Sequence, residues 1–208
     1  MRTGKPQLLL ELEGHGREEI FEDVDLSRTV GWFTTLFPLL LNLENTNNIE
    51  DALKSIKEQL RQIPTRGFSY GVLRYRSDET IQKKLQAFPQ TEIRFNYLGQ
   101  ADQLFTQSSL FSPASELTGF SRSPNNQRDI LIEINGIIIR GQLQINWTYS
   151  KGIHHQTTIK NLAQNYLNIL RELIQHCLST ETGGYTPSDF PQMDFTQTEL
   201  DELLEELG

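Results

Sequence analysis

The stretch QLLLELEGHGRE, from Gln7 to Glu18, joins a short apolar run to a turn crowded with titratable side chains. The apolar run predicts a β-strand that stops at Gly14. The glycines on either side of His15 let the backbone turn sharply and approach a ligand closely. Glu13 therefore stands at a strand end, where burial that raised its pKa would make it a general acid or base. By composition alone, a turn with a surface glutamate is the simpler interpretation.

A second candidate stretch is FNYLG, from Phe95 to Gly99, at the end of a strand predicted over 92–99. Alternate residues of this strand are apolar or aromatic, so Asn96 and Tyr97 lie on opposite faces near its end. Either side chain could donate a hydrogen bond to a developing oxyanion.

Other motifs predict no metal or phosphate site. His15 could act as a base or a metal ligand, but no second ligand lies at a telling spacing, so a zinc site is not expected. His154 and His155 precede QTTIK without an acidic partner and are better explained as a polar loop before a helix. The stretch from Ile63 to Gly71 has two glycines but lacks the lysine and the serine or threonine of a phosphate loop.

Strand and helix signals follow one another in mixed order along the chain. We expect a loop and then a buried extended segment over 23–43, an amphipathic helix over 48–63, a strand or tight turn over 68–75, a short helix over 77–88 capped by Ser77, an irregular stretch over 100–128, a hairpin over 129–150 that turns at Asn135–Gly136, and a helix over 157–178. This order predicts an α/β (α+β mixed) fold, a mixed β-sheet with helices packed on it.

The last residues have a different composition. The stretch 180–191 is linker-like, and 196–208 predicts a short acidic helix that Thr196 and Glu199 open with a capping box.

Composition excludes several classes of protein. The chain has 208 residues, 37% of them hydrophobic and 22% charged, which is typical of a globular protein. It has no apolar run long enough to cross a membrane, and we expect no secretory signal. The single cysteine, Cys177, fits a reducing cytosol, so we expect a cytoplasmic protein. The formal net charge of -8 has the wrong sign for nucleic-acid binding.

Four stretches together resemble, in order and spacing, the signature motifs of the C-terminal half of an epimerization domain of a nonribosomal peptide synthetase, in the condensation-domain superfamily. They are EGHGRE (13–18), RTVGWFTTLFPLLL (28–41), PTRGFSYG (64–71) and FNYLGQ (95–100). The tail, with YTPSDFP before an acidic helix, also resembles the linker that follows such domains. The resemblance covers nearly the whole chain.

The resemblance implies a chloramphenicol-acetyltransferase-like lobe. The family's domain has two such lobes, and the N-terminal lobe carries an HHxxxDG motif that this sequence lacks. We therefore interpret residues 1–179 as an isolated C-terminal lobe and 180–208 as a linker and short acidic helix. The chain would be a cloned fragment, a split gene product or a remnant.

The same resemblance implies an isomerase chemistry. The family converts L to D configuration at Cα of an aminoacyl or peptidyl thioester, held on the phosphopantetheine of a peptidyl carrier domain, and binds no cofactor directly. By motif match, Glu13 would be the acid or base of this lobe. Asn96 and Tyr97 would lie near the tunnel, where they could steady the enolate or orient the groups that do. The partner histidine would come from the missing N-terminal lobe, without which no turnover is expected.

Further residues match the motifs without a catalytic role. We expect Arg17 and Glu18 to form a structural ion pair, and Trp32 and Phe33 to serve packing. The remaining matches of this structural kind are His15, Arg28, Tyr70 and Gly71.

Two alternatives stay open. A condensation domain shares the two-lobed fold and forms peptide bonds. A non-catalytic module would instead dock a carrier domain, with the acidic tail helix meeting a basic partner. For a lone lobe, an exposed apolar inter-lobe surface also predicts self-association.

Overall fold

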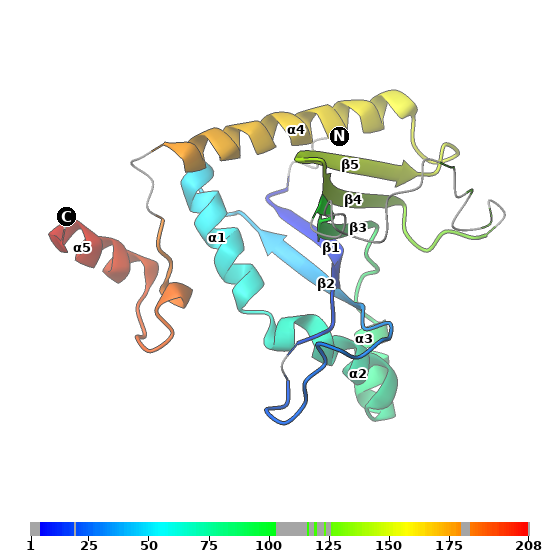
Figure 1. Ribbon diagram of the computed structural model, residues 1–208, viewed down its shortest axis with the longest axis horizontal. Coiled ribbons are helices and arrows are strands. Elements are labelled where there is room, and N and C mark those ends of the chain that lie inside the picture. The colour runs from blue at the N-terminus through cyan, green and yellow to red at the C-terminus, as the bar shows by residue number, and fades with distance from the viewer. Residues whose placement is uncertain are drawn as a thin grey trace.

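A mixed five-stranded sheet forms the centre of the computed structural model, which describes residues 5–18, 20–102, 116, 119, 123, 126–179 and 184–207 (Figure 1). The strands are β1 (Gln7–Gly14), β2 (Thr35–Asn42), β3 (Ile93–Gln100), β4 (Ile132–Ile139) and β5 (Gln142–Tyr149), in the spatial order β2-β1-β3-β4-β5. The pairs β1–β2 and β4–β5 are antiparallel, and β1–β3 and β3–β4 are parallel. The predicted mixed sheet is confirmed.

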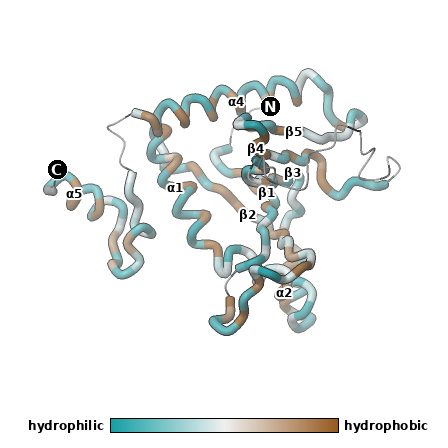
Figure 2. Tube along the Cα trace, viewed as in Figure 1, coloured by the Kyte–Doolittle hydropathy of each residue, from teal (hydrophilic) through white to brown (hydrophobic). Residues whose placement is uncertain are grey.

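Of the five described helices, α1, α2 and α4 lie against the sheet. The helices are α1 (Ile49–Arg61), α2 (Phe68–Arg76), α3 (Glu79–Gln86), α4 (Gln156–Leu178) and α5 (Gln197–Leu207), with 3₁₀ turns η1 (Pro64–Gly67) and η3 (Pro187–Asp189). Helix α3 packs on α2. Figure 1 shows α4 running along β5, and α1 contacts both β2 and α4. Figure 2 shows apolar and polar positions interspersed along α1 and α4, as amphipathic helices require. The predicted helices over 48–63 and 157–178 are confirmed.

The sheet has one apolar and one polar face because apolar and polar residues alternate in three neighbouring strands, LELE in β1, IRFN in β3 and IEIN in β4. On the apolar face, Ile132 and Ile134 are buried against Ile159 of α4. Trp147 of β5 meets Tyr166 of α4 edge-on, with ring centroids 5.9 Å apart. The polar face carries the acidic residues of β1.

The predicted hairpin is real, but its turn lies elsewhere. Asn135 and Gly136 are inside β4, paired with Asn96 and Tyr97 of β3. The chain turns at Arg140–Gly141, where φ is 53° and 68°, as a two-residue turn with positive φ at both positions demands. The side chain of Asp102 accepts hydrogen bonds from both of these backbone N–H groups. The Asn135–Gly136 prediction was wrong because pairing within the sheet overrides a local turn preference.

Two further predictions were wrong. Residues 68–75 form helix α2 rather than a strand or tight turn, since the stretch is too short to show its period and follows the left-handed Gly67, with φ of 86°. The cap of α3 is Asp78, whose side chain accepts from Ile81 N at 3.1 Å, and not Ser77, which bonds back to the carbonyl of Leu73. Most of the stretch 100–128 lies outside the described residues, as do 180–183.

The tail folds back on α1. Asp189 of η3 lies 2.7 Å from Arg61 Nη1 and 2.5 Å from Lys57 Nζ, and Lys54 lies 3.4 Å from Asp201 of α5. Leu200 of α5 is only 1% exposed. The hydrogen bond from Lys57, and then those from Thr186 N and Arg61, hold the pKa of Asp189 well below its usual range. The Thr196–Glu199 capping box is confirmed.

We predict that Asp189→Asn loosens the tail. The amide removes the carboxylate that Lys57 and Arg61 share, which we expect to cost about 1 kcal/mol because the network is partly exposed. Hydrogen exchange of residues 197–207 should rise about fivefold, and Lys83→Met, at an exposed ion pair of α3, should change nothing there. Because the folded pKa is lowered, the wild-type contact should persist at pH 4 and be lost only as the pH falls further. Unchanged hydrogen exchange in Asp189→Asn would show that these ion pairs do not hold the tail on α1.

Candidate functional site

Glu13 and Asn96 meet at the centre of the sheet. Strands β1 and β3 are parallel neighbours with Glu11 opposite Arg94 and Leu12 opposite Phe95, so Glu13 and Asn96 follow one step further along. Asn96 Nδ2 donates to Glu13 Oε2 over 2.7 Å, and both residues are half-buried. A carboxylate that accepts this bond is held in one orientation at the end of its strand. Sequence alone proposed both residues, and the structure brings them together.

Tyr97 lies on the other face of β3 from Asn96, because successive residues of a strand alternate. Its ring contacts Gly136 of β4, where a Cβ would lie 3.4 Å from Cδ2 of the ring. The third predicted catalytic residue is therefore next to Asn96 in the chain but directed away from it.

The turn after β1 is held by a chain of polar contacts. Arg17 N donates to His15 Nδ1 over 3.0 Å, so the neutral imidazole carries its proton on Nε2. That nitrogen lies 3.2 Å from Glu18 Oε1, and Glu18 Oε2 lies 3.3 Å from Arg66 Nη1. Both ring nitrogens of His15 are thus engaged, which fits a structural role. The described residues contain no group of three or more histidine, cysteine or acidic side chains placed to hold a metal.

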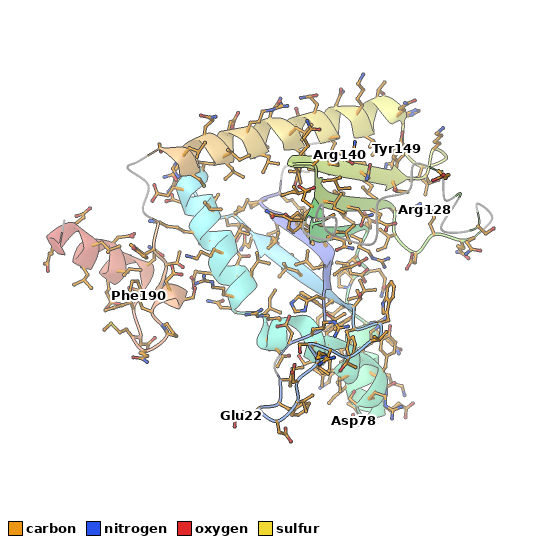
Figure 3. The ribbon with its side chains drawn as sticks, viewed as in Figure 1. Glu22, Asp78, Arg128, Arg140, Tyr149 and Phe190 are labelled. Carbon is orange, nitrogen blue, oxygen red and sulfur yellow. The ribbon has the colours of Figure 1, made fainter. Side chains whose placement is uncertain are left out.

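Arg17 fixes the loop between β1 and β2. Its guanidinium donates to the carbonyls of Leu26 and Thr29, over 2.6 and 2.8 Å, and lies 4.3 Å from the ring centroid of Phe33. The expected pair between Arg17 and Glu18 was wrong, because Glu18 pairs with His15 and Arg66 instead. Figure 3 shows Glu22 at the outer end of this loop, away from the sheet.

The remaining motif residues fall into three environments. Phe33 packs under Arg17 as expected, but Trp32 is 90% exposed, so its packing role was wrong for the described part of the chain. A Cβ on Gly31 would lie 2.9 Å from Cε2 of the Phe33 ring, so this position has no room for a larger residue unless the ring moves. Arg28 is exposed. In α2, Tyr70 accepts a hydrogen bond from Arg74, and Gly71 has open space beside it.

A hollow of about 590 Å³ opens next to this turn, lined by His15, Arg17, Glu18, Ile20, Thr65 and Arg66. It lies close to the end of β1, since a Cβ on Gly14 would stand 3.8 Å from the carbonyl oxygen of Arg66. Thr65 and Arg66 both have positive φ, 46° and 48°, which is unusual for side chains of this kind. Strained backbone of this sort concentrates at functional sites.

One feature of the site was not predicted. Arg94 is 6% exposed, and its Nε and Nη2 each lie 2.6 Å from Glu11 Oε2, with Asp129 3.3 Å from Nη2. Burial alone would lower the pKa of Arg94, but Glu11 and Asp129 outweigh it, and the pKa is raised. The sequence signal for this pair was an acidic residue in one predicted strand and an arginine in another. It could not be used because the sequence does not show that the two strands are neighbours.

The fold and the motifs define a family. The chain belongs to the condensation domain family, whose model matches residues 2–195. Among solved structures, it is similar to the epimerization domain from the third module of tyrocidine synthetase B, with a TM-score of 0.73 and 36% identity. That match covers 84% of this chain and 38% of that chain.

Other likenesses agree. A linear gramicidin synthase protein of Brevibacillus parabrevis is 48% identical over 97% of this chain, which spans 3% of that protein. Surfactin synthase subunit 1 of Bacillus subtilis is 36% identical over 98% of this chain and 6% of that protein. The first condensation domain of the CDA synthetase, 13% identical with a TM-score of 0.50 over 82% of this chain and 35% of that chain, shows the fold alone.

These matches confirm the expected resemblance and the chloramphenicol-acetyltransferase-like fold, and the relatives are nonribosomal peptide synthetases. In the described part of the chain, no helix has the length and apolar character that crossing a bilayer requires.

We predict that Arg17→Gln loosens the loop between β1 and β2. The amide cannot span the carbonyls of Leu26 and Thr29 or stack on Phe33, so hydrogen exchange over residues 20–34 should rise at least about threefold. Arg28→Gln, an exposed arginine of the same loop, is the matched control and should leave exchange unchanged. Equal effects of the two substitutions would show that Arg17 is an ordinary surface arginine.

Proposed function

We propose that this chain is the C-terminal lobe of an epimerization domain. Its substrate would be an aminoacyl or peptidyl thioester on the phosphopantetheine arm of a peptidyl carrier domain, and its reaction the change from L to D configuration at Cα. The observation that carries the proposal is the Glu13–Asn96 hydrogen bond at a strand end, two residues before His15, which lines the hollow. Support also comes from the 36% identity to an epimerization domain of known structure.

Glu13 would move the proton on one face of Cα. As the Cα–H bond breaks, its electron pair passes to the thioester carbonyl, and the proton passes to the carboxylate. The oxyanion that develops needs a hydrogen-bond donor. Asn96 uses one amide N–H to hold Glu13, and its second N–H would be available to the developing oxyanion. Return of a proton to the opposite face completes inversion.

The second face needs a partner, which we assign to an N-terminal lobe. Support comes from the exposed apolar residues on the face that carries Glu13. Leu36 of β2 pairs with Glu13 in the sheet, and Leu40, which is 54% exposed, pairs with Leu9. Exposed leucines beside a polar site are typical of a surface that another protein part covers. The tyrocidine epimerization domain extends well beyond the 38% that this chain matches.

A condensation domain lobe is the second candidate, favoured by the name of the matching family model. The similarity to the CDA condensation domain, at 13% identity, is far weaker than that to the epimerization domain. Detection of a new amide and no D-residue in a product assay would favour the condensation reaction.

Loss of a deuterium label from Cα tests the proposed function. We expect no loss from a carrier-bound aminoacyl thioester with this chain alone, and loss when a separately expressed N-terminal lobe is added. Glu13→Gln should then slow exchange by about 10²–10⁴-fold, the usual contribution of a general base. Glu44→Gln, which removes a carboxylate beyond the end of β2, is the control. Full activity of Glu13→Gln would exclude Glu13 as the acid or base.

We also predict that the chain self-associates through the face that carries Leu36 and Leu40. Sedimentation velocity should show concentration-dependent association, and Leu40→Lys should reduce it because a charge cannot be buried in an apolar contact. Leu178→Lys, at an exposed leucine of α4, is the matched control. A monomer at all concentrations would show that this face does not mediate self-association.

A further inference from the structure

The ion pair Glu11–Arg94 lies on the same face of the sheet as the Glu13–Asn96 pair, two residues earlier in each strand. In both β1 and β3 the two residues are separated by a single intervening residue, so their Cα atoms are about 7 Å apart along each strand. Because β1 and β3 run parallel, the two pairs form successive rungs between the same two strands.

The first rung fixes the geometry of the second. Two nitrogens of Arg94 converge on one oxygen of Glu11, and Arg94 also reaches Asp129 before β4. A slip of one residue between β1 and β3 would turn Arg94 to the apolar face and leave a buried charge unpaired. The same slip would move Asn96 away from Glu13.

The first rung also sets the charge around Glu13. Among the described residues of the sheet, the titratable groups on this face are Glu11 on β1, Arg94 on β3 and Glu133 on β4. Asp129, just before β4, lies 3.3 Å from Arg94, and Arg128 lies 4.0 Å from Glu133. Strand β2 contributes none. Past the strand end, Glu18 is paired with His15 and Arg66. Arg94 is the one cation on this face among the described strand residues, and Glu11 and Asp129 both pair with it.

We propose that Glu11 and Arg94 are positioning residues for Glu13, which hold it against Asn96 and keep its surroundings electrically balanced. This inference rests on the proposed role of Glu13 as acid or base and deepens it. Neither residue touches the substrate. Their effect is to fix where the carboxylate stands and at which pH it changes its protonation state.

The test is a pH titration of the Glu13 carboxyl by ¹³C NMR, in the full chain labelled at glutamate side chains, with the signal assigned by its loss in Glu13→Gln. In Arg94→Gln the negative charge of Glu11 is no longer compensated and disfavours the Glu13 carboxylate. The pKa of Glu13 should therefore rise by about 0.5–1 unit. In Glu11→Gln the charge of Arg94 is less compensated, and the pKa should fall by a similar amount. The double variant should return toward wild type.

Glu79→Gln and Lys83→Gln, which break an exposed pair on α3, are the controls and should shift nothing. A merely structural role would move both single variants in the same direction or not at all, and either result would overturn the proposal. Arg94→Lys separates charge from geometry. It should keep the pKa of Glu13 near wild type but displace the Asn96 side-chain amide resonances, and unchanged resonances would reject the geometric role.

The NMR result is independent of turnover, so the two proposals fail separately. Opposite shifts without label exchange in the two-lobe mixture would support the positioning pair and reject the epimerase. Label exchange without opposite pKa shifts would support the epimerase and reject the positioning pair. If exchange occurs, Arg94→Lys should lower kcat at least about tenfold with KM little changed.

Discussion

Parallel strands β1 and β3 meet at the centre of the sheet, and their register is the constraint on which the remaining structure depends. Each strand places apolar side chains on one face and charged or amide side chains on the other. The apolar set packs under α4, and no register other than the observed one buries it while pairing Arg94 with Glu11. One choice of register therefore determines the core, the buried ion pair and the candidate site together.

A buried arginine is expensive, because removing its charge from water costs several kcal/mol before any pairing. Here Glu11 and Asp129 offset that cost, and Arg94 links β1, β3 and the segment before β4. A pair of apolar residues would serve stability as well. What such residues could not supply is a penalty for the wrong register, which makes specificity the more natural physical explanation for the pair.

Local signals predicted most elements but not their adjacency. The alternation of LELE and the glycine after Glu13 were enough to place that carboxylate at a strand end, and FNYLG placed Asn96 at another. Their contact depends on a parallel pairing between residues 83 positions apart, which no local pattern encodes. The same limit explains the hairpin error, since Asn135–Gly136 has turn chemistry but sits where β3 and β5 pair with it on both sides. The Arg17 contacts were missed because backbone carbonyls carry no sequence signal.

The docking of the tail on α1 limits how far a protein joined behind the tail can move from the lobe. As an unanchored coil, residues 180–207 would give whatever is joined behind them an average excursion of about 30 Å. The contacts of Asp189 and Asp201 with α1 remove most of that excursion, because they hold the chain beside α1 again (Figure 3 labels Phe190, the residue after Asp189). Anyone fusing a second protein to this lobe should count spacer length from the end of α5 and not from the end of α4.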